Sequence, residues 1–516
     1  MKIKFLLILS IAFCLTNCKA QKLTVWEDFK KAKKDNTEPI LPDFSYSGYK
    51  YSEVPIPNVD FKIFDVTKFG AIANDTKSDK NAIVKAIAAA TKNGEGVIYF
   101  PKGKYYINTD SDDNSIINIK SSKIVFRGED RNTTILYFEN YLPAKDPKKL
   151  WTCPSAIKVD TPKRGKKIAK IIEDAKRETK SIKVADASKI KKGDWITIEV
   201  LNNDKEFVKK DIYPLKLEPK WKKIINKGVQ VNEHHQVKNV VGNTITLVEP
   251  LYYSIEKKYN WNIREYKYLN HIGFENLTLE GNWKEKFKHH KNAIHDGGWS
   301  ILKMQHVVDS WIKNITFRNI NRAASINSSA ATTAINVLIE GNIGHNAISA
   351  SGSTGILIAN SNDVAGMQHS FGVGGGSNIN TVIWRSKYAD HTSFESHASQ
   401  PRNTLFDNIE GGFMQGRAGG ATQSLPNHGR YLVLWNYKET DKSEEDFRFV
   451  ATDTWYWRIV PPIIVGFHGS GTTFNINEVQ TLESLGTPVN PESLFEAQLK
   501  LRLGKIPNWI KEIKNQ

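Results

Sequence analysis

Three features of the 516-residue sequence predict an all-β protein built as a parallel β-helix. Short strand-like runs recur from Ile315 onward at steps of roughly 20 to 27 residues, the length of one coil of three short strands. The helices that βαβ units require do not alternate with these runs. Asn276, Asn314 and Asn336 each precede such a run, where stacked Asn side chains can hydrogen-bond along the solenoid. We therefore expect one elongated repeat domain.

The first coils carry a helix that we expect to cover their open end. Residues 64–107 read as strand, loop, helix and strand, with the helix beginning at Ser78 or Asp79 and ending at Gly94. Its apolar face of Ile83, Ile87 and Ala90 must pack against another element, and the end of a stack of strands is a suitable partner.

The other end of the chain predicts a second helix, packed on the outside of the solenoid or on its last coil. Asn490 is the expected N-cap, followed by Pro491 at the first helical position, and Gly504 is the expected stop. Leu494, Ala497 and Leu501 form the expected apolar face of this helix.

The repeat is interrupted by a Lys-rich segment, residues 141–259, which predicts an inserted β-rich subdomain with a helical stretch near Ile168–Glu178. Insertions of this kind often form the walls of a binding site. The expected layout is therefore a signal segment (1–20), a lead-in (21–60), N-terminal coils with their cap (61–140), the insertion, central and C-terminal coils (260–480) and a helical tail (481–516).

The first twenty residues are typical of a secretory signal: Lys2 and Lys4 precede an apolar run from Phe5 to Leu15, which is too short to span a bilayer. Cleavage after Ala20 and lipidation of Cys18 are both compatible with the sequence. We therefore expect an exported protein, either periplasmic, attached to the cell surface or secreted. Cys153 is the one cysteine beyond this segment, which excludes a disulfide framework.

The charge balance indicates an anionic partner. The formal net charge is +17, and about +14 remains after loss of the signal segment. Exported proteins rarely meet nucleic acid, and no nucleic-acid-binding motif is present. An acidic polysaccharide or oligosaccharide is the expected partner, with a basic solvated surface as the alternative. The sequence does not predict an oligomeric state.

A familiar pattern lies between Asp65 and Ile107. It consists of Asp65-Val66, Phe69-Gly70-Ala71, an Asp-rich loop, a helix and the segment Gly96 to Tyr105. This stretch resembles the N-terminal module of the pectate-lyase superfamily, and residues 491–504 look like a tail common there. The resemblance implies a single-stranded right-handed parallel β-helix over most of the chain. Residues 299–437 are also similar to β-helix proteins of bacteria that degrade marine algal polysaccharides, although no residue roles follow from that likeness.

Two chemistries are open to a sugar-cleaving enzyme on this fold. Hydrolysis needs carboxylates that face the scissile bond. The polygalacturonase pattern of Asn-Thr-Asp, Asp-Asp and Gly-His-Gly on successive central coils is not met, because Asn108-Thr109-Asp110 and Asp112-Asp113 lie together in the first coils and Gly344-His345 has no Asp-Asp before it. A hydrolase would have to use other carboxylates, with Asp363, Asp390, Glu395 and Asp407 as the alternatives.

β-Elimination on a uronate needs a cation at the carboxylate, a base for the C5 proton and an acid for the group leaving C4. His345, His369 and His397 are about one coil apart and are the catalytic candidates, together with His428 on the next coil. Glu395 lies two residues before His397 and can orient it, or can simply pair with an Arg. Any one of these histidines alone is more often a bend residue than a base.

The expected substrate contacts come from basic and aromatic residues in the same coils. Arg side chains suit a carboxylate or sulfate, and Trp435 could stack on a sugar ring or pack under the terminal helix. The candidate arginines are Arg322, Arg402, Arg417 and Arg430. Two His pairs, His234-His235 and His289-His290, could reach across the groove. Ca²⁺ could supply the cation, but no cluster of acidic residues at Ca²⁺-ligand spacing stands out, so we expect no cofactor.

The sequence thus predicts an exported carbon–oxygen lyase that acts on uronate residues of an anionic, sulfated, ulvan-like polysaccharide or its oligosaccharides. The group expelled from C4 is either a sugar, as in chain cleavage, or water, as in a non-reducing-end oligosaccharide dehydratase. The large insertion favours the end-acting mode. The alternatives are a β-helix glycoside hydrolase and a non-catalytic surface protein that binds polysaccharide, which buried histidines and a lipid at Cys18 would support.

Overall fold

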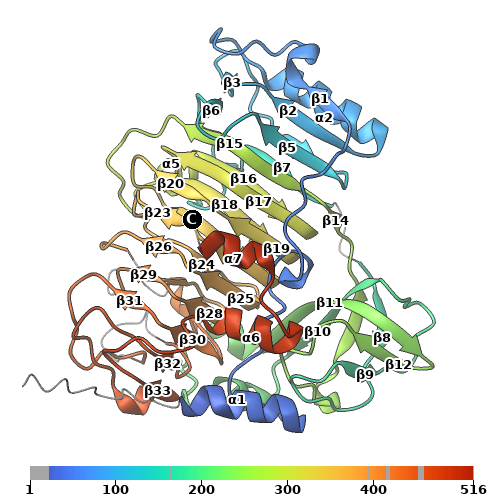
Figure 1. Ribbon diagram of the computed structural model, residues 1–516, viewed down its shortest axis with the longest axis vertical. Coiled ribbons are helices and arrows are strands. Elements are labelled where there is room, and N and C mark those ends of the chain that lie inside the picture. The colour runs from blue at the N-terminus through green and yellow to red at the C-terminus, as the bar shows by residue number, and fades with distance from the viewer. Residues whose placement is uncertain (1–22, 162–164, 393, 414–418, 451–457, 515–516) are drawn as a thin grey trace, which may run out of the picture. The chain divides into compact units, whose positions relative to one another are not determined.

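The computed structural model describes residues 23–161, 165–392, 394–413, 419–450 and 458–514 (Figure 1). The chain divides into two compact units, residues 1–40 and 41–516. The described part of the first unit contains α1 (Thr24–Asp35), which ends at Asn36 in the left-handed conformation, φ 52°. The predicted signal segment and Cys18 lie outside the described residues.

The second unit is a stack of parallel strands, which confirms the predicted β-helix (Figure 1). The first face of the stack continues from β1 to β33, each strand pairing in parallel with the next. A short strand, β14, also pairs with β17. These strands are β1 (Ile63–Asp65), β2 (Gly96–Phe100), β5 (Ile124–Gly128), β14 (Leu269–Asn270), β15 (Gly273–Gly281), β17 (Val307–Arg318), β19 (Ala330–Ile335), β22 (Thr354–Ala359), β25 (Ile379–Trp384), β28 (Arg402–Asp407), β30 (Leu432–Trp435), β32 (Ile463–Val465) and β33 (Thr481–Glu483).

The second face is joined to the first through β15 and β17, which are long enough to belong to both. Its other strands are β3 (Gly103–Ile107), β6 (Thr134–Phe138), β20 (Leu338–Glu340), β23 (Asn362–Asp363), β26 (Lys387–Tyr388), β29 (Glu410–Gly411) and β31 (Lys438–Glu439).

The third face is a separate parallel sheet, and it carries most of the residues discussed below. In spatial order its strands are β4 (Ile117–Ile119), β7 (Ile157–Val159), β16 (Ser300–Gln305), β18 (Arg322–Asn327), β21 (Asn346–Ser351), β24 (Gly372–Val373) and β27 (Glu395–Ser396).

The core is a continuous column of apolar side chains inside the stack. One such column runs in register across seven coils, and every member is 0 % exposed: Ile312, Ala334, Ile358, Ile383, Phe406, Leu434 and Ile464. Since each coil buries its apolar residues only against its two neighbours, the repeat seen in the sequence is the repeat of this packing.

The predicted Asn ladder is present at a bend of the coils. Asn314 donates from Nδ2 to Oδ1 of Asn276 at 2.9 Å, and Asn360 donates to Asn336 at 2.8 Å. All four residues have positive φ, between 43° and 57°. Asn tolerates this left-handed conformation better than most residues, so the same side chain meets both the backbone and the hydrogen-bonding demands of the bend.

We expect Asn314→Ala to lower the free energy of unfolding by about 1–3 kcal/mol. The substitution removes one side-chain hydrogen bond, and it leaves alanine, which cannot form such a bond, in the left-handed conformation at φ 55°. Urea unfolding measures the change. Asn81→Ala, at an exposed position of the helix α2 (Lys80–Asn93), is the matched control and is not expected to destabilise the protein. Equal stability of the two variants would show that the ladder contributes nothing.

The inserted subdomain is a six-stranded sheet with two short helices. Its strands pair antiparallel in the order β8-β13-β10-β11-β12-β9. The predicted helical stretch near Ile168–Glu178 is wrong: β8 occupies its beginning, because those residues pair with β13 as the edge of this sheet. The elements are β8 (Lys167–Lys170), β9 (Ser181–Lys183), β10 (Trp195–Asn202), α3 (Lys205–Ile212), α4 (Lys222–Lys227), β11 (Val229–Val241), β12 (Thr244–Leu247) and β13 (Asn262–Glu265).

The N-terminal cap agrees with the prediction in both position and buried face. Asp79 is the N-cap of α2, Gly94 ends it at φ 90°, and Ile83, Ile87 and Ala90 are buried. The Asp79 carboxylate does not cap the helix itself. It accepts hydrogen bonds from the backbone N–H groups of Ile72 and Tyr106, which ties the helix to the first coil.

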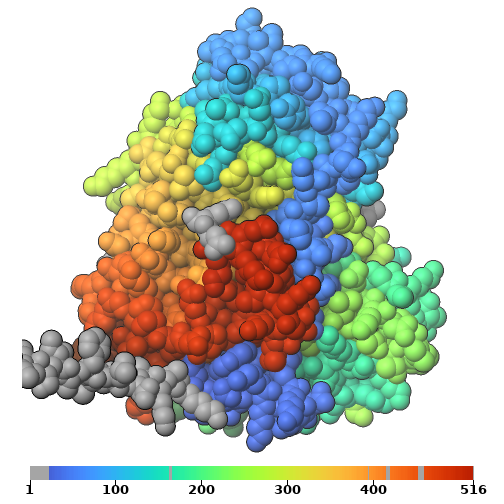
Figure 2. Space-filling view, in the orientation of Figure 1, coloured from blue at the N-terminus to red at the C-terminus, as the bar shows by residue number. Residues whose placement is uncertain are grey.

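The C-terminal helix α6 (Leu494–Leu503) differs from the prediction at its start and in its buried face. Its N-cap is Ser493, whose hydroxyl accepts from the Glu496 N–H, in place of Asn490. The buried apolar residues are Leu494, Phe495 and Leu499, whereas Leu501 is 45 % exposed. Figure 2 shows this red segment lying on the yellow and orange coils. A last helix, α7 (Asn508–Lys514), follows it. No helix within the described residues is long and apolar enough to cross a membrane.

Candidate active site

Five histidines, His289, His290, His345, His369 and His397, form a group that we call the histidine cluster. His289 and His290 come from the segment between β15 and α5 (Ala293–Gly297), and His345 precedes β21. His369 precedes β24 and bridges to Asn346, and His397 follows β27. Ring centroids lie 5.0 Å apart for His345 and His369 and 6.1 Å apart for His369 and His397. The three histidines predicted from one-coil spacing are therefore brought together.

The His289 and His290 rings lie on the same cluster. They stack on each other at 3.6 Å, and His289 lies 5.2 Å from His345 and 5.3 Å from His369. Sequence reasoning named this pair but expected it to reach across a groove from some distance. It missed Asp296, whose carboxylate accepts a 2.6 Å hydrogen bond from His290 Nδ1.

A polar column on the third face leads to the cluster. The register aligns Lys158, Lys303, Ser325, Ser349, Gly372 and Glu395 on six successive strands. The flanking positions on each side point inward, as in the buried Leu302 and Met304. Because the middle of this column has only hydroxyl groups and a glycine, an extended ligand can approach the sheet closely there. Of the two lysines at its far end, Lys158 is paired with Asp160 at 2.7 Å, so Lys303 carries the positive charge there. Only the register revealed them, since they are 145 residues apart in the chain.

Glu395 pairs with His369 instead of the predicted His397. Its Oε2 accepts from His369 Nδ1 at 2.7 Å, whereas His397 Nδ1 donates to the Ala398 carbonyl at 2.9 Å. Gly372, opposite Glu395 on the adjacent strand, explains the difference: a Cβ there would lie 2.6 Å from the Glu395 Cβ. The missing side chain gives the carboxylate room to turn toward the preceding coil. Its second oxygen, Oε1, is buried without a hydrogen-bond partner in the described part of the chain.

Three imidazoles of the cluster are held neutral at pH 7. Burial, and after it the neighbouring His369 and His290, lower the pKa of His289 to about 4. Burial also lowers the pKa of His345 well below its ordinary value, and lowers the pKa of His397. A neutral imidazole keeps one ring nitrogen with a lone pair, which can take a proton or bind a cation.

Arg322 is the one predicted arginine that lies at the cluster among the described residues. It opens β18, and its Nη2 lies 3.1 Å from His345 Nδ1. His345 Nδ1 also lies 2.8 Å from the Asp296 carbonyl oxygen, which can only accept a hydrogen bond. We therefore assign the proton to His345 Nδ1, and Arg322 contributes its charge to the cluster without donating to this histidine. Arg322 Nε is buried without a described partner.

The other predicted substrate contacts are not at the cluster. Arg402 is buried and bonds to Asp211 of the insertion at 2.6 Å, so its charge is already balanced. Trp435 is 0 % exposed and donates to the Pro491 carbonyl at 2.8 Å, so it packs under the C-terminal segment. Arg430 donates to the Lys210 carbonyl at 2.8 Å, again toward the insertion. Arg402 is therefore unavailable to a substrate, Trp435 takes the packing alternative, and the substrate role of the half-buried Arg430 stays a prediction. Arg417 lies outside the described residues.

The structure also contradicts the predicted catalytic role of His428. It is 0 % exposed, its Nδ1 donates to the Gly429 carbonyl at 2.8 Å, and its Nε2 accepts from the Thr404 hydroxyl at 2.9 Å. With both ring nitrogens occupied inside the protein, it cannot reach a substrate.

His428 should instead make stability depend on pH. Burial lowers its pKa to about 4, while the unfolded chain binds the proton near pH 6.5. Between these values the unfolded state holds the extra proton, so the free energy of unfolding falls as the pH drops, by up to about 3 kcal/mol. Urea unfolding from pH 7 to pH 4.5 should therefore show a shallower fall for His428→Gln than for the unmodified chain. Parallel pH profiles would contradict this assignment.

The carboxylates considered for hydrolysis do not form a facing pair. Asp363 and Asp407 are 0 % exposed: the first accepts from Gly366, Met367 and Ser370, and the second caps α6. Asp390 accepts from the Thr440 hydroxyl, and Glu395 holds His369. Two of the four are therefore closed to any substrate, and each of the four already has a partner.

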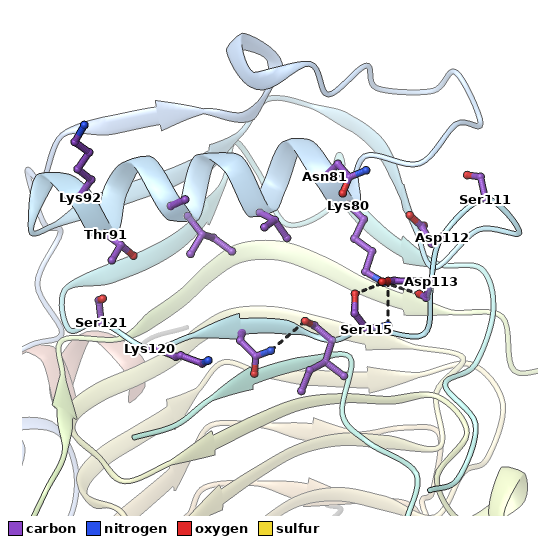
Figure 3. Close-up of a pocket in the computed structure, with 15 residues that line it drawn as sticks. Lys80, Asn81, Thr91, Lys92, Ser111, Asp112, Asp113, Ser115, Lys120 and Ser121 are labelled. Carbon is purple, nitrogen blue, oxygen red and sulfur yellow. Dashed lines mark hydrogen bonds and ion pairs between the residues drawn. The ribbon is translucent and has the colours of Figure 1, made fainter. Parts of the chain in front are cut away.

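Two cavities frame the third face. The larger, about 670 Å³, lies beside α2 and is lined by Lys80, Asp112 and Asp113 among others, with Lys80 Nζ bonded to Asp113 (Figure 3). It has no histidine in its lining and is distinct from the cluster. The second is a groove of about 510 Å³ between the insertion and the ends of β16, β18 and β21.

The second groove leads toward His397. Ser351 and Gly375 line it, and the register from Ser396 to Val373 and Ala350 places His397 one position further, beside Gly374 and two coils from Ser351. Asn232 and Arg264 of the insertion line its opposite wall. The insertion thus forms a wall of a groove that ends near the cluster.

Comparison with known proteins supports the fold. Residues 63–145 match the family model described as rhamnogalacturonase A/epimerase, pectate lyase-like. The predicted resemblance to the pectate-lyase superfamily is confirmed. Residues 366–513, which include His369, Glu395 and His397, match a domain of unknown function, DUF4955. No curated protein is significantly similar to this chain. The likeness to proteins that act on marine algal polysaccharides stays a prediction.

Several solved structures are similar to this chain at low identity. The surface adhesin PfbA of Streptococcus pneumoniae is 12 % identical over 80 % of each chain, with a TM-score of 0.41. The A-module of the Azotobacter vinelandii mannuronan C-5 epimerase AlgE6 is 11 % identical over 83 % of this chain and 97 % of its own, with a TM-score of 0.39. The tailspike gp49 of Pseudomonas phage LKA1 is 14 % identical over 80 % of this chain and 72 % of its own, with a TM-score of 0.37. Function must therefore be argued from the site.

Proposed function

We propose that this protein is an exported carbon–oxygen lyase that performs β-elimination on uronate residues of an anionic polysaccharide or its oligosaccharides. The observation that carries the proposal is the histidine cluster, in which neutral imidazoles and Arg322 gather at one end of a polar column. A base with a free lone pair and a nearby positive charge are two of the three requirements of elimination next to a carboxylate, the third being an acid for the leaving group.

In this proposal His397 removes the C5 proton. Its Nδ1 donates to the Ala398 carbonyl, which leaves Nε2 with the lone pair, and burial keeps it neutral by lowering its pKa. Glu395 fixes His369, so the two neighbouring histidines have different partners and different roles. Arg322 adds the positive charge that makes the C5 proton of a uronate more acidic.

The bond changes follow from this arrangement. As His397 takes the C5 proton, a double bond forms between C4 and C5 and the C4–O bond breaks. The departing oxygen needs a proton, and protonated His397 can return one when both groups lie on the same face of the sugar ring.

Charge and shape support an anionic chain as the substrate. Lys303 lies on the polar column that ends at Glu395, so it can hold a carboxylate or sulfate group of a neighbouring sugar, whereas Lys158 beside it is paired with Asp160. A sulfated uronan such as ulvan fits this charge pattern. The wall formed by the insertion along the groove favours action at a chain end, and hence a dehydratase or an end-acting lyase.

The alternative of a non-catalytic binding protein is supported by one observation, the burial of His345, which is 7 % exposed. His369, with 11 % of its side chain exposed, and His397 are more accessible. Binding alone does not explain why imidazoles with free lone pairs should gather at this point.

Ultraviolet absorbance and mass spectrometry of reaction products test the proposal. Purified mature protein is incubated with a panel of uronate-containing polysaccharides and with their oligosaccharides. We expect an unsaturated-uronate absorbance, and a product lighter than the substrate by one water would identify dehydration. Products without this absorbance would identify a hydrolase, and binding without turnover would support the non-catalytic alternative.

A further inference from the structure

Three rings of the histidine cluster form a nearly equilateral triangle. The centroids of His289, His345 and His369 are 5.0, 5.2 and 5.3 Å apart. One ring nitrogen from each lies within 4.8 Å of the other two. Imidazoles bound to one tetrahedral zinc, at Zn–N distances of about 2.0–2.1 Å, have centroids about 5 Å apart. The three rings are therefore already at the spacing that a shared ion requires.

In two of these rings, His345 and His369, the hydrogen bonds occupy Nδ1 and leave Nε2 available to bind an ion. His369 Nδ1 bonds to the Glu395 carboxylate at 2.7 Å, and His345 Nδ1 donates to the Asp296 carbonyl at 2.8 Å. Each interaction fixes the proton on Nδ1 and leaves the lone pair on Nε2. Metal-bound histidines almost always have such a carboxylate or carbonyl partner on the second nitrogen.

The third ring has a buried nitrogen with no partner. His289 Nε2 is inaccessible to solvent and has no hydrogen bond within the described residues. An unsatisfied buried nitrogen costs free energy, and burial beside other imidazoles usually needs a compensating interaction. A cation among the three rings would supply one.

We propose that His289, His345 and His369 bind one divalent transition-metal ion, with Zn²⁺ as the best fit, in a three-histidine site that keeps a fourth position open. Imidazole suits zinc, copper, nickel and iron, whereas Ca²⁺ and Mg²⁺ require oxygen ligands. The proposal differs from the sequence-based expectation of no cofactor, with Ca²⁺ as the alternative, because the ligands are nitrogens.

The surrounding charges are compatible with a cation. Arg322 opposes it, whereas the carboxylates of Glu395 and Asp296 favour it. A second grouping, His290, Asp296 and His345, also brings its ligand atoms within 4.8 Å. Because it shares His345, and because Asp296 is already bonded to His290, we assign the ion to the first group.

The open position gives the ion a task that rests on the proposed function. There a uronate carboxylate oxygen binds as the fourth ligand, and the metal, as a Lewis acid, makes the C5 proton more acidic. His369 then serves as a ligand, and His397, which is outside the three, remains the base.

Metal content and a spectroscopic probe test the site independently of activity. Untagged protein is stripped with a chelator, incubated with Zn²⁺, desalted and analysed by elemental mass spectrometry. We expect one ion per chain. Co²⁺ in place of Zn²⁺ should give the visible absorption of a four-coordinate site.

Single substitutions define the ligands. His289→Ala, in a surface segment, and His369→Ala should each lose the stoichiometric ion and the Co²⁺ absorption, and Glu395→Gln should weaken binding by about 10–100-fold. His391→Gln, at an exposed histidine outside the cluster, and Cys153→Ser, which removes the thiol, should retain full binding. Circular dichroism checks that each variant is folded.

The outcomes separate the two proposals. Stoichiometric binding that depends on His289 and His369, without elimination on any substrate, would support the metal site and overturn the lyase. Elimination by chelator-treated protein that takes up no ion would overturn the metal site and leave the lyase intact. Binding that survives His289→Ala and His369→Ala but is lost in Cys153→Ser would also overturn it.

Discussion

Replacing His397 by Gln is expected to lower the rate of uronate elimination by about 10²–10⁴-fold, the usual contribution of a general base. Gln keeps a polar side chain of similar reach but cannot accept the C5 proton. Because His397 lies partly at the surface and its ring, among the residues the structure describes, makes one hydrogen bond, to the Ala398 carbonyl, folding should be little affected. Initial rates of double-bond formation measure the effect, and the metal content should be unchanged.

His391→Gln is the matched control for this prediction. It changes the same residue type at an exposed position between β26 and β27 of the same coil, outside the cluster, and should keep the full rate. If His397→Gln retained activity while His369→Gln lost it, the base would be the histidine paired with Glu395, and the roles assigned here would be reversed.

Asp211→Ala is expected to destabilise the protein by about 3–5 kcal/mol, the cost of leaving a buried charge without its partner. Arg402 has 2 % of its side chain exposed and bonds to Asp211 across the contact between the insertion and β28. Asp211 also accepts from the Tyr253 hydroxyl at 2.9 Å. Its removal would leave both groups facing a carboxylate-sized gap.

Urea or thermal unfolding measures this change, and the double variant Asp211→Leu with Arg402→Met is the comparison. Replacing both charges with apolar groups of similar volume should cost much less than removing one. Equal loss in the two variants would show that packing, and not the uncompensated charge, accounts for the effect. The pair also explains why Arg402, predicted to bind substrate, is unavailable for that role.

The fold could be predicted from local signals because the solenoid repeats them. The Asn residues with positive φ, the apolar runs and the capping helix each follow from a few neighbouring residues. The insertion was harder to predict. Residues 167–170 pair with β13, which lies more than 90 positions later, and nothing local distinguishes such an edge strand from a helix. The start of α6 was misplaced for a related reason, since Asp407 on a distant coil bonds to its first amides.

At the site, spacing along the chain identified His345, His369 and His397 because one coil is one repeat. It could not show which side of a coil a residue occupies. His428, Arg402 and Trp435 lie in the same run of coils but turn toward the interior, the insertion or the terminal helix. The partner of Glu395 was likewise decided by Gly372 on the adjacent coil. Lys158 and Lys303 became visible only through the register.

The most direct test of the account is to follow a deuterium at C5 of the uronate. A labelled oligosaccharide that is a substrate is incubated with the protein, and the products are weighed by mass spectrometry. Elimination at the histidine cluster predicts that the product carrying the new double bond has lost the C5 deuterium, at a rate slower than for unlabelled substrate. A cleaved product that keeps the deuterium would contradict elimination and would identify hydrolysis instead.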